Sequence, residues 1–314
     1  MTSTSPSTEP VPPHPSGTKK SDLHQILRET AAAVEDALDL LLPPPDGLYA
    51  RVIEAMRYAV FAGGKRLRPF LVLQSASLFD VPQARALRVA AAIEALHTYS
   101  LVHDDLPCMD DDDLRRGQPT THKKFDEATA VLAGDALLTF AFEVLSDPQT
   151  HPDGAVRSAL VTRLAQAGGS AGMIGGQMID MQAATRKFSA DDAVLLQRLK
   201  TGALFEFSCE AGAILGQAPD TDRARLREYA RDIGLSFQIT DDLIDVAGDA
   251  ALAGKTLGKD VEQGKATLVS FYGIDGARAE AAKHANHAAG LMDVYGARAA
   301  HLRQLPHYLL DRAS

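Results

Sequence analysis

Two aspartate-rich segments hold the residues of this chain that are best suited to chemistry. Asp241-Asp242-Leu243-Ile244-Asp245 follows Gln238 by one turn, and residues three and four apart share a helical face. Residues 104–113 bring further carboxylates close together; these are Asp104, Asp105, Asp110, Asp111, Asp112 and Asp113. Two like charges about 4 Å apart repel by roughly 4 kcal/mol at an effective dielectric constant near 20. We therefore expect cations or solvent to relieve this repulsion.

A solvated acidic loop is the alternative interpretation of residues 104–113. Against it, Leu101-Val102-His103 leads into Asp104 and places this aspartate at the end of a core helix. Sites made only of oxygen ligands suit Mg²⁺ or Ca²⁺, whereas zinc prefers His and Cys. The chain has no loop with EF-hand spacing, and Mg²⁺ commonly binds through one or two carboxylates plus a substrate phosphate. The two segments therefore predict magnesium ions that hold a diphosphate.

A dense basic turn, Gly63-Gly64-Lys65-Arg66-Leu67-Arg68-Pro69, supplies the opposite charge. Paired glycines permit unusual backbone angles and close approach of an anion, and Arg and Lys both bind phosphate. Arg115-Arg116-Gly117 follows the first aspartate segment. A plain surface turn is the alternative for residues 63–69. The spacing of a P-loop is absent, and no dinucleotide-binding fingerprint follows a strand.

The composition excludes several other classes of function. The formal net charge is −9, from 32 Lys and Arg against 41 Asp and Glu, which argues against non-specific nucleic-acid binding. Cys108 and Cys209 are the two cysteines, so a disulfide scaffold is not expected and a cytoplasmic location fits best. Residues 1–20 are rich in Ser, Thr and Pro and predict a disordered tail rather than a signal peptide. No later segment has the uninterrupted apolar length that a membrane span requires.

The elements that must position these residues are helices. Apolar residues make up 46% of the chain, Ala and Leu dominate, and Trp is absent, which favours helix over strand. A helix is expected to start near Asp80-Val81-Pro82 and to stop near Asp105, because Leu106 precedes Pro107. Further helices are predicted from Ser189 through Lys200 toward Ile214 and from about Asp222 to Val246.

The glycines at 168, 169, 172, 175 and 176 are expected in a helical region, where small residues allow close packing or leave room for a ligand. Packing alone is the alternative. We predict one all-α domain, residues 21–314, built as a helical bundle around a central cavity.

Taken together, these segments resemble the trans-isoprenyl diphosphate synthases, and within them the bacterial farnesyl diphosphate synthases. The resemblance runs from about Asp22 to the C-terminus, although residues 273–314 match only loosely. The matching stretches are residues 63–69, residues 97–117 (HTYSLVHDDLPCMDDDDLRRG), residues 134–138 (GDALL), Gly175-Gly176-Gln177, Lys200-Thr201, residues 237–245 (FQITDDLID) and residues 264–267 (GKAT).

The resemblance implies the isoprenoid synthase fold, a homodimer, and head-to-tail joining of isopentenyl diphosphate to an allylic diphosphate. It implies Mg²⁺, three ions in each active site, on Asp104, Asp105, Asp110 and Asp241, with Asp111, Asp242 and Asp245 beside them. By the same resemblance, Arg115, Lys200 and Lys255 bind the allylic diphosphate, and Lys265 is a further phosphate contact. Isopentenyl diphosphate is expected on Lys65, Arg68, His97 and Arg116. Thr201 and Gln238 are expected to face the developing allylic cation.

Product length is expected to depend on the helix before Asp104. Tyr99 lies five residues earlier, about 7.5 Å along the axis at 1.5 Å per residue, and with Ser100 it is expected to contact the growing chain. A ring there resembles the farnesyl synthases and predicts a fifteen-carbon product; a core aromatic without this role is the alternative. Geranyl or geranylgeranyl diphosphate as product, a non-catalytic regulatory subunit, and a terpene cyclase are the other candidates. The intact second aspartate segment and the basic turn argue against the last two.

Overall fold

The structure is a computed structural model that describes residues 20–183, 186, 188–252 and 268–311. The described part is almost entirely helical, which confirms the predicted all-α class. The helices are α1 Lys20–Leu41, α2 Ala50–Val60, α3 Leu67–Ser77, α4 Gln83–Asp104, α5 Thr121–Lys124, α6 Glu127–Ser146, α7 Gly154–Gly168, α8 Met173–Ala183, α9 Ala190–Gln197, α10 Ala203–Leu215, α11 Asp220–Leu252, α13 Leu268–Leu291 and α14 Ala300–Leu310. Two-residue strands, β1 Leu114–Arg115 and β2 Gln118–Pro119, form an antiparallel hairpin after the first aspartate segment.

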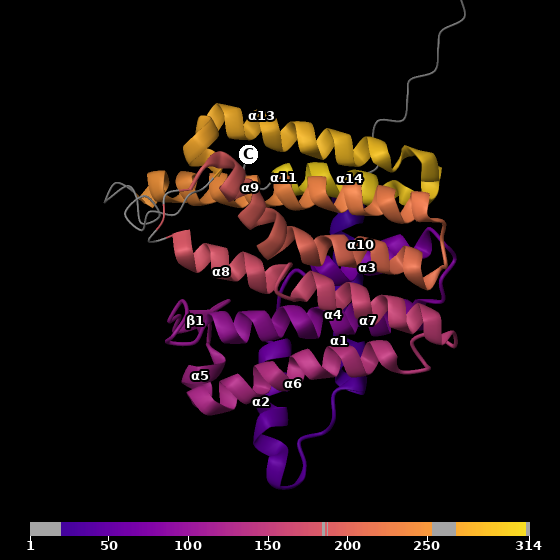
Figure 1. The fold of residues 1–314 in the computed structure, drawn as a ribbon, viewed down its shortest axis with the longest axis vertical. Helices are drawn as coiled ribbons and strands as arrows, with labels where there is room; N and C mark the ends of the chain where they lie inside the picture. The colour runs from indigo at the N-terminus through magenta and orange to yellow at the C-terminus, as the bar shows by residue number, and fades with distance from the viewer. Residues whose placement is uncertain (1–19, 184–185, 187, 253–267, 312–314) are drawn as a thin grey trace, which may run out of the picture.

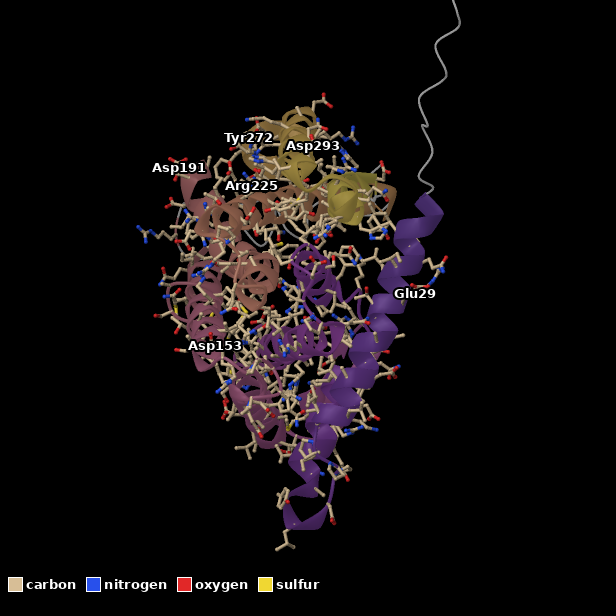
Figure 2. The ribbon with its side chains drawn as sticks, turned by 90° about the vertical axis from the view of Figure 1, so that its right-hand side faces the viewer. Glu29, Asp153, Asp191, Arg225, Tyr272 and Asp293 are labelled. Atoms are coloured by element: carbon tan, nitrogen blue, oxygen red, sulfur yellow. The ribbon has the colours of Figure 1, made fainter. Side chains whose placement is uncertain are left out.

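The helices lie in layers around α4 (Figure 1). Helix α4 packs against α6 on one side and α3 on another, and α10 packs between α3 and α11. Helices α11, α13 and α14 form the far layer (Figure 1). Helix α1 runs along the outside of this bundle, where Glu29 points to solvent (Figure 2), while Val34 and Leu38 on its inner face are fully buried. The core is therefore divided between the α4 region and the α10–α11–α14 region.

Helix α4 carries the first aspartate segment out of the core. Pro82 is its N-cap residue, within the predicted start at residues 80–82, and its last residue is Asp104. The predicted stop near Asp105 is confirmed. Its physical cause is that Leu106, which precedes Pro107, disfavours helical geometry. Ile93 and Leu96 are fully buried along the helix. Asp104 is thus fixed at the end of a rigid core element.

The helix predicted from Ser189 to Ile214 is interrupted. The expected capping box is present, with the Ser189 side chain accepting from Asp192 N and the Asp192 side chain accepting from Ser189 N. After α9, residues Arg198–Gly202 form a π-helical turn before α10 begins. Helix α8 presses on this turn, since a Cβ at Gly176 would lie 2.2 Å from the Lys200 backbone nitrogen. Such single π turns often occur at functional sites.

Two other expectations are refined by the structure. The glycines at 169 and 172 lie in a break between α7 and α8 rather than inside a helix. Within the described residues, α6 is the one helix long and apolar enough to cross a membrane by length and composition, and half of that stretch is buried. Asp135 and Glu143 interrupt it, and it packs against α2 and α4. A core helix of a soluble protein passes the same test.

The close contact between α10 and α3 depends on Gly212. A Cβ there would lie 2.3 Å from Ala76 N and 2.4 Å from Ser75 C. We expect Gly212→Ala to lower the free energy of unfolding by about 1–3 kcal/mol, because the backbones must separate. Urea unfolding measures this. Gly290→Ala in α13 is the matched control, since a Cβ there meets nothing within 4 Å. An equal loss in both variants would contradict the close-packing account.

Candidate active site

A cavity of about 610 Å³ lies where α4, α8 and the π turn meet. It brings together seven residues predicted from the sequence, namely Arg68, His97, Tyr99, Ser100, Asp104, Lys200 and Thr201. The rest of its wall is mostly apolar and includes Met173, Met178, Met181 and Leu204. A cavity with charged groups at one end and apolar walls beyond them suits a ligand with a charged head and a hydrocarbon tail.

The carboxylate of Asp104 is held in an unfavourable environment. Burial raises its pKa to about 6; Asp110 and Asp105 add to the rise, while Lys200 and Arg115 oppose it. The chain returns to this helix end after Pro107, because Asp110 N donates to Asp104 O at 2.9 Å. Asp110 itself is exposed. Asp104 and Asp110, both expected as magnesium ligands, therefore lie close together.

Asp105 faces the protein rather than the open cavity. It is 3% exposed, and Arg115 Nε donates to its Oδ1 at 2.7 Å and its Oδ2 at 2.9 Å. Burial raises the pKa of Asp105 even though Arg115 opposes the rise. Both residues were expected on the magnesium–diphosphate unit. In this structure the two are paired with each other, so Asp105 orients Arg115 beside Asp104.

The outer aspartates of the segment belong to the hairpin loop. Asp111 has a left-handed backbone, with φ of 51°. Asp112 lies 3.6 Å from Arg115 Nη2, and Asp113 pairs with Lys123 at 2.8 Å. Thr120 Oγ1 donates to the Asp112 carbonyl at 2.8 Å. These contacts fix the loop that carries Arg115 and Arg116.

The second aspartate segment lies on α11 as predicted. Gln238 Nε2 donates to Asp242 Oδ1 at 3.0 Å, and Leu268 N donates to Asp242 Oδ2 at 3.2 Å. Burial raises the pKa of Asp242 to about 6, and its hydrogen bonds only partly offset this. Asp241 is half-buried and Asp245 is exposed. Asp242 therefore ties α11 to the start of α13, while its two neighbours are more open.

Gln238 connects this segment to the π turn. Thr201 Oγ1 donates to Gln238 Oε1 at 3.3 Å, so the expected pair of dipoles is assembled beside Lys200. Lys255 and Lys265, the other two expected phosphate contacts, lie outside the described residues.

The donors at this site fit magnesium completed by a substrate. Among the described residues, no group of three or more His, Cys, Asp or Glu side chains lies close enough to hold a metal unaided. Mg²⁺ needs fewer protein ligands, because it commonly binds one or two carboxylates together with phosphate oxygens and water. The raised pKa values of Asp104 and Asp242 show carboxylates whose charge is not yet compensated. A divalent cation would supply that compensation.

The basic turn forms a second pocket of about 610 Å³, lined by Lys65, Arg68, His97 and Arg116 as predicted. The glycines have positive φ, 87° at Gly63 and 136° at Gly64. A Cβ at Gly64 would lie 2.4 Å from Arg116 Nη1, and Arg116 donates to the Gly63 carbonyl. The turn therefore needs glycine for its backbone, and a side chain at residue 64 would also displace the Arg116 guanidinium.

Glu94 is a member of the basic pocket that sequence reasoning missed. It is 3% exposed and accepts from Arg66 Nη1 at 2.6 Å. Arg66 also donates to the Val60 carbonyl at 2.6 Å and to Glu35 at 3.1 Å. The charge of Glu94 favours the cationic forms of Arg68 and Arg116, although burial still lowers the pKa of Arg68 to about 10. Its position three residues before His97 was the available signal.

His97 contributes to this pocket without a charge. Burial and the nearby arginines hold its pKa well below the usual range, with Arg68 the largest charge effect. A neutral imidazole offers one donor and one acceptor. We therefore expect His97 to bind a ligand through a hydrogen bond rather than through an ion pair.

Helix α8 also contributes residues that were not predicted. Asp180 Oδ2 lies 2.6 Å from Lys200 Nζ, so this lysine is positioned by a carboxylate. Gln177 lines the cavity that holds Asp104 and Lys200, and its buried Oε1 has no hydrogen-bond partner among the described residues. Helical spacing from the Gly175-Gly176-Gln177 stretch, which the resemblance singled out, would have led to Asp180 at three residues' distance.

Tyr99 lies in the wall of the cavity. Its side chain is mostly buried, and its ring meets the His103 ring edge-to-face with centroids 5.6 Å apart. Burial raises the pKa of Tyr99 to about 12, and the charge of Asp104 adds to the rise.

The uncompensated charge of Asp104 predicts a pH-dependent gain from its removal. The folded pKa of about 6 lies above the unfolded value of 3.8, so ionisation costs stability as pH rises from about 4 to about 6. Without magnesium, we expect Asp104→Asn to unfold at higher urea than the parent at pH 8, by about 1–2 kcal/mol, but not at pH 4. Asp113→Asn is the control, because Lys123 lowers the pKa of Asp113 and its removal brings no gain. A gain that is independent of pH would contradict this account.

Comparison with known proteins agrees with this geometry. The polyprenyl synthetase family matches residues 50–303. The chain is 42% identical over 288 residues to a farnesyl diphosphate synthase of Geobacillus stearothermophilus, covering 90% of this chain and 96% of that protein. It is also 42% identical over 301 residues to geranylgeranyl pyrophosphate synthase 11, chloroplastic, of Arabidopsis thaliana, covering 93% of this chain and 82% of that one.

A solved structure shares the fold. The crystal structure of an FPP/GFPP synthase from Zymomonas mobilis, in its apo form, superposes with a TM-score of 0.84 and 46% sequence identity. The similarity covers 92% of this chain and 99% of that chain. The predicted isoprenoid synthase fold and the predicted kind of enzyme are thereby confirmed. The chain belongs to the polyprenyl synthetase family and is a prenyltransferase.

Proposed function

We propose that this prenyltransferase joins isopentenyl diphosphate head to tail with dimethylallyl and then geranyl diphosphate, giving (2E,6E)-farnesyl diphosphate and diphosphate. The observation that carries the proposal is the cavity in which Asp104, Lys200 and Thr201 lie at one end of a largely apolar space that includes Tyr99. The charged end would hold the diphosphate, and the apolar space would hold the growing chain. We call this space the substrate cavity.

The allylic diphosphate is placed at the aspartate end. Asp104, Asp110 and Asp241 are the proposed magnesium ligands, three ions in all, with Asp105, Asp242 and Asp245 as supports or further ligands. Bound Mg²⁺ would neutralise charge on the departing diphosphate. Two side chains would also neutralise this charge. They are Lys200, which Asp180 positions at 2.6 Å, and Arg115, which Asp105 positions. Lys255 and Lys265 remain proposed contacts from the sequence.

The allylic cation left by ionisation needs oriented dipoles and little water. Thr201 donates its hydroxyl hydrogen to Gln238, so the oxygen lone pairs of Thr201 are free to face positive charge. Preorganised dipoles of this kind lower the cost of developing charge. The methionines of α8 and Leu204 make the neighbouring wall apolar, which keeps out the water that would otherwise trap the cation.

Isopentenyl diphosphate is placed in the basic pocket. Lys65, Arg68 and Arg116 would bind its diphosphate as cations, and neutral His97 would donate a hydrogen bond. Glu94 keeps these arginines assembled before the substrate arrives. The double bond of isopentenyl diphosphate then forms the new carbon–carbon bond with the allylic cation, and a proton leaves the adjacent carbon to the released diphosphate.

Elongation of each allylic starter tests the activity directly. With Mg²⁺ and isopentenyl diphosphate, we expect the purified protein to extend dimethylallyl and geranyl diphosphate to fifteen carbons, as measured by chromatography of the dephosphorylated products. Asp104→Ala and Asp241→Ala should each lower kcat by at least about 100-fold, whereas Asp113→Ala, at the exposed Lys123 pair, should not. No elongation of any starter would favour the alternative of a non-catalytic subunit.

Tyr99 is proposed to limit the chain at fifteen carbons. Its ring lies in the cavity wall about one and a half helical turns before Asp104. We expect Tyr99→Ala to release longer products, with geranylgeranyl diphosphate the first to appear. Tyr49→Ala is the control, because Tyr49 is exposed outside the cavity. Unchanged fifteen-carbon products from Tyr99→Ala would remove the ring from this role and leave it a core aromatic.

A homodimer is proposed because part of the cavity wall is exposed. Val131 on α6 is 40% exposed, and Ile174 and Met178 on α8 are 47% and 55% exposed, yet all three line the substrate cavity. A second copy packed on this face would cover them. Light scattering should give the mass of two chains, and a single-chain mass at micromolar concentration would contradict the proposal. The cytoplasmic location and the single domain of residues 21–314 stay predictions from the sequence.

A further inference from the structure

A third cavity lies behind the π turn, on the side away from the substrate cavity. Its volume is about 810 Å³, and it runs between α7 and the residues that join α9 to α10. Arg163 and Gln166 of α7 lie on one side of this outer groove, and Arg198 and Glu206 lie on the other. None of these residues lines the substrate cavity.

The wall between the outer groove and the substrate cavity is one stretch of helix. Leu199 and Ala203 line the outer groove, while Lys200, Thr201 and Leu204 line the substrate cavity. Residues on the two faces of this stretch therefore line different cavities. A ligand that contacts Leu199 would act on Lys200 and Thr201, because all three belong to the same π turn.

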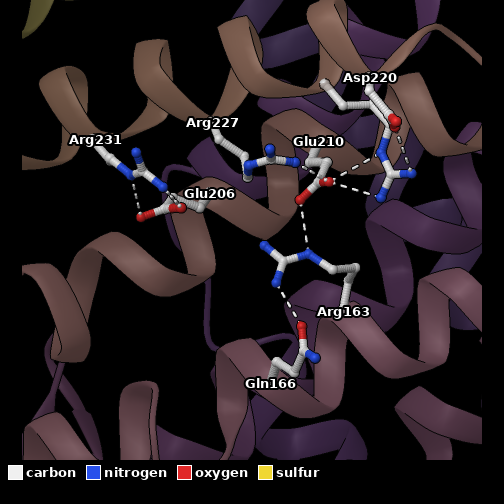
Figure 3. Close-up of polar contacts among 8 residues, drawn as sticks. Arg163, Gln166, Glu206, Glu210, Asp220, Arg227 and Arg231 are labelled. Atoms are coloured by element: carbon white, nitrogen blue, oxygen red, sulfur yellow. Dashed lines mark hydrogen bonds and ion pairs between the residues drawn. The ribbon is translucent and has the colours of Figure 1, made fainter.

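The outer groove lies in a positively charged region of an acidic protein. Figure 3 shows Glu210, which is fully buried, bound by Arg163 at 2.8 Å and by Arg227 at 2.6 Å. Arg223 contacts the same carboxylate at 2.9 Å. Asp220 Oδ1 lies 3.7 Å from Arg223 Nη1, so two carboxylates contact three guanidinium groups in this cluster. The chain as a whole has a net charge of −9, so this local excess of arginine has the opposite sign to the net charge of the protein.

Guanidinium groups on the lining have donors to spare. Arg163 uses Nε on Glu210 and Nη1 on Gln166. Arg198 is exposed, and its guanidinium contacts no partner among the described residues. The one carboxylate on the lining, Glu206, accepts from Arg231 Nε at 3.0 Å and Nη2 at 3.1 Å, so its charge is compensated. The groove therefore favours an anion.

The remaining lining is mixed: Thr162 and Ser170 are polar, and Val161, Ala165 and Ala167 on α7 form an apolar strip with Leu199 and Ala203. We propose that the groove binds an amphiphilic anion, a phosphate or carboxylate head on an aliphatic body, and that its occupancy changes turnover through the π turn. The head lies at Arg163 and Arg198, and the body lies along the α7 alanines. Binding goes beyond the proposed synthase activity, and only the effect on turnover rests on it.

Titration of the full chain with octyl phosphate tests binding without any turnover. We expect Arg198→Ala to weaken binding about tenfold, as loss of one charge-assisted contact does. Ala165→Glu should abolish it by placing a negative charge in the groove. Arg28→Ala is the matched control, since Arg28 is exposed on α1, and it should bind as the parent does. Equal binding in all four proteins would place the ligand elsewhere and overturn the proposal.

Related ligands test the chemistry of the site. Inorganic phosphate should bind at least tenfold more weakly than octyl phosphate, because each buried methylene contributes favourably, and octanol should not bind. Comparing the affinities of octyl phosphate and octanoate identifies the head group. Similar affinities mean that the site accepts either anion, and a higher affinity for one of them means that the site prefers phosphate or carboxylate. Octanol or inorganic phosphate binding as tightly as octyl phosphate would contradict an amphiphilic anion.

The coupling is measured at saturating concentrations of both substrates. Octyl phosphate should change kcat at least twofold in the parent and leave kcat unchanged in Ala165→Glu. Inhibition that excess allylic diphosphate abolishes in both proteins would place the effect in the substrate cavity and overturn the coupling. Binding that persists in a preparation without any synthase activity would separate this site from the proposed function.

Discussion

The structure depends on two carboxylates, Asp104 half-buried and Asp242 buried, that lack enough positive charge around them. Burial raises the pKa of both Asp104 and Asp242 to about 6, so the protein alone holds them at a cost. A core helix fixes one and the packing of α11 on α13 fixes the other. The proposed cations and diphosphate would supply the charge that these two carboxylates lack.

The two ends of the active site are organised in opposite ways. In the basic pocket, charge is balanced beforehand, since Glu94 pairs with Arg66 and supports Arg68 and Arg116, and His97 is held neutral. At the aspartate end, the available cations are already engaged, Arg115 by Asp105 and Lys200 by Asp180. In the proposed reaction the carbon–oxygen bond would break at the aspartate end, where charge stabilisation would be needed and where the carboxylates are not compensated.

Sequence patterns between near neighbours predicted the helix ends well. They predicted poorly which side chains pair across the fold. Leu106-Pro107 marked the end of α4, and the spacing from Ser189 to Asp192 marked the start of α9, because both depend on neighbours in the sequence. The π turn could not be predicted, since its residues continue a helical pattern and close packing of Gly176 accompanies it. Glu94 was hidden among alanines on a core helix. Asp105 and Arg115 were both recognised, but their mutual pairing depends on the fold of the hairpin loop.

We propose that magnesium and diphosphate complete the aspartate site together. Thermal unfolding of the protein at pH 8 with Mg²⁺, with inorganic diphosphate, and with both tests this most directly, because a ligand that binds only the folded state raises Tm. We predict that the rise with both ligands exceeds the sum of the two separate rises. A combined rise no larger than that sum, or the full rise from diphosphate in the presence of a chelator, would contradict the account.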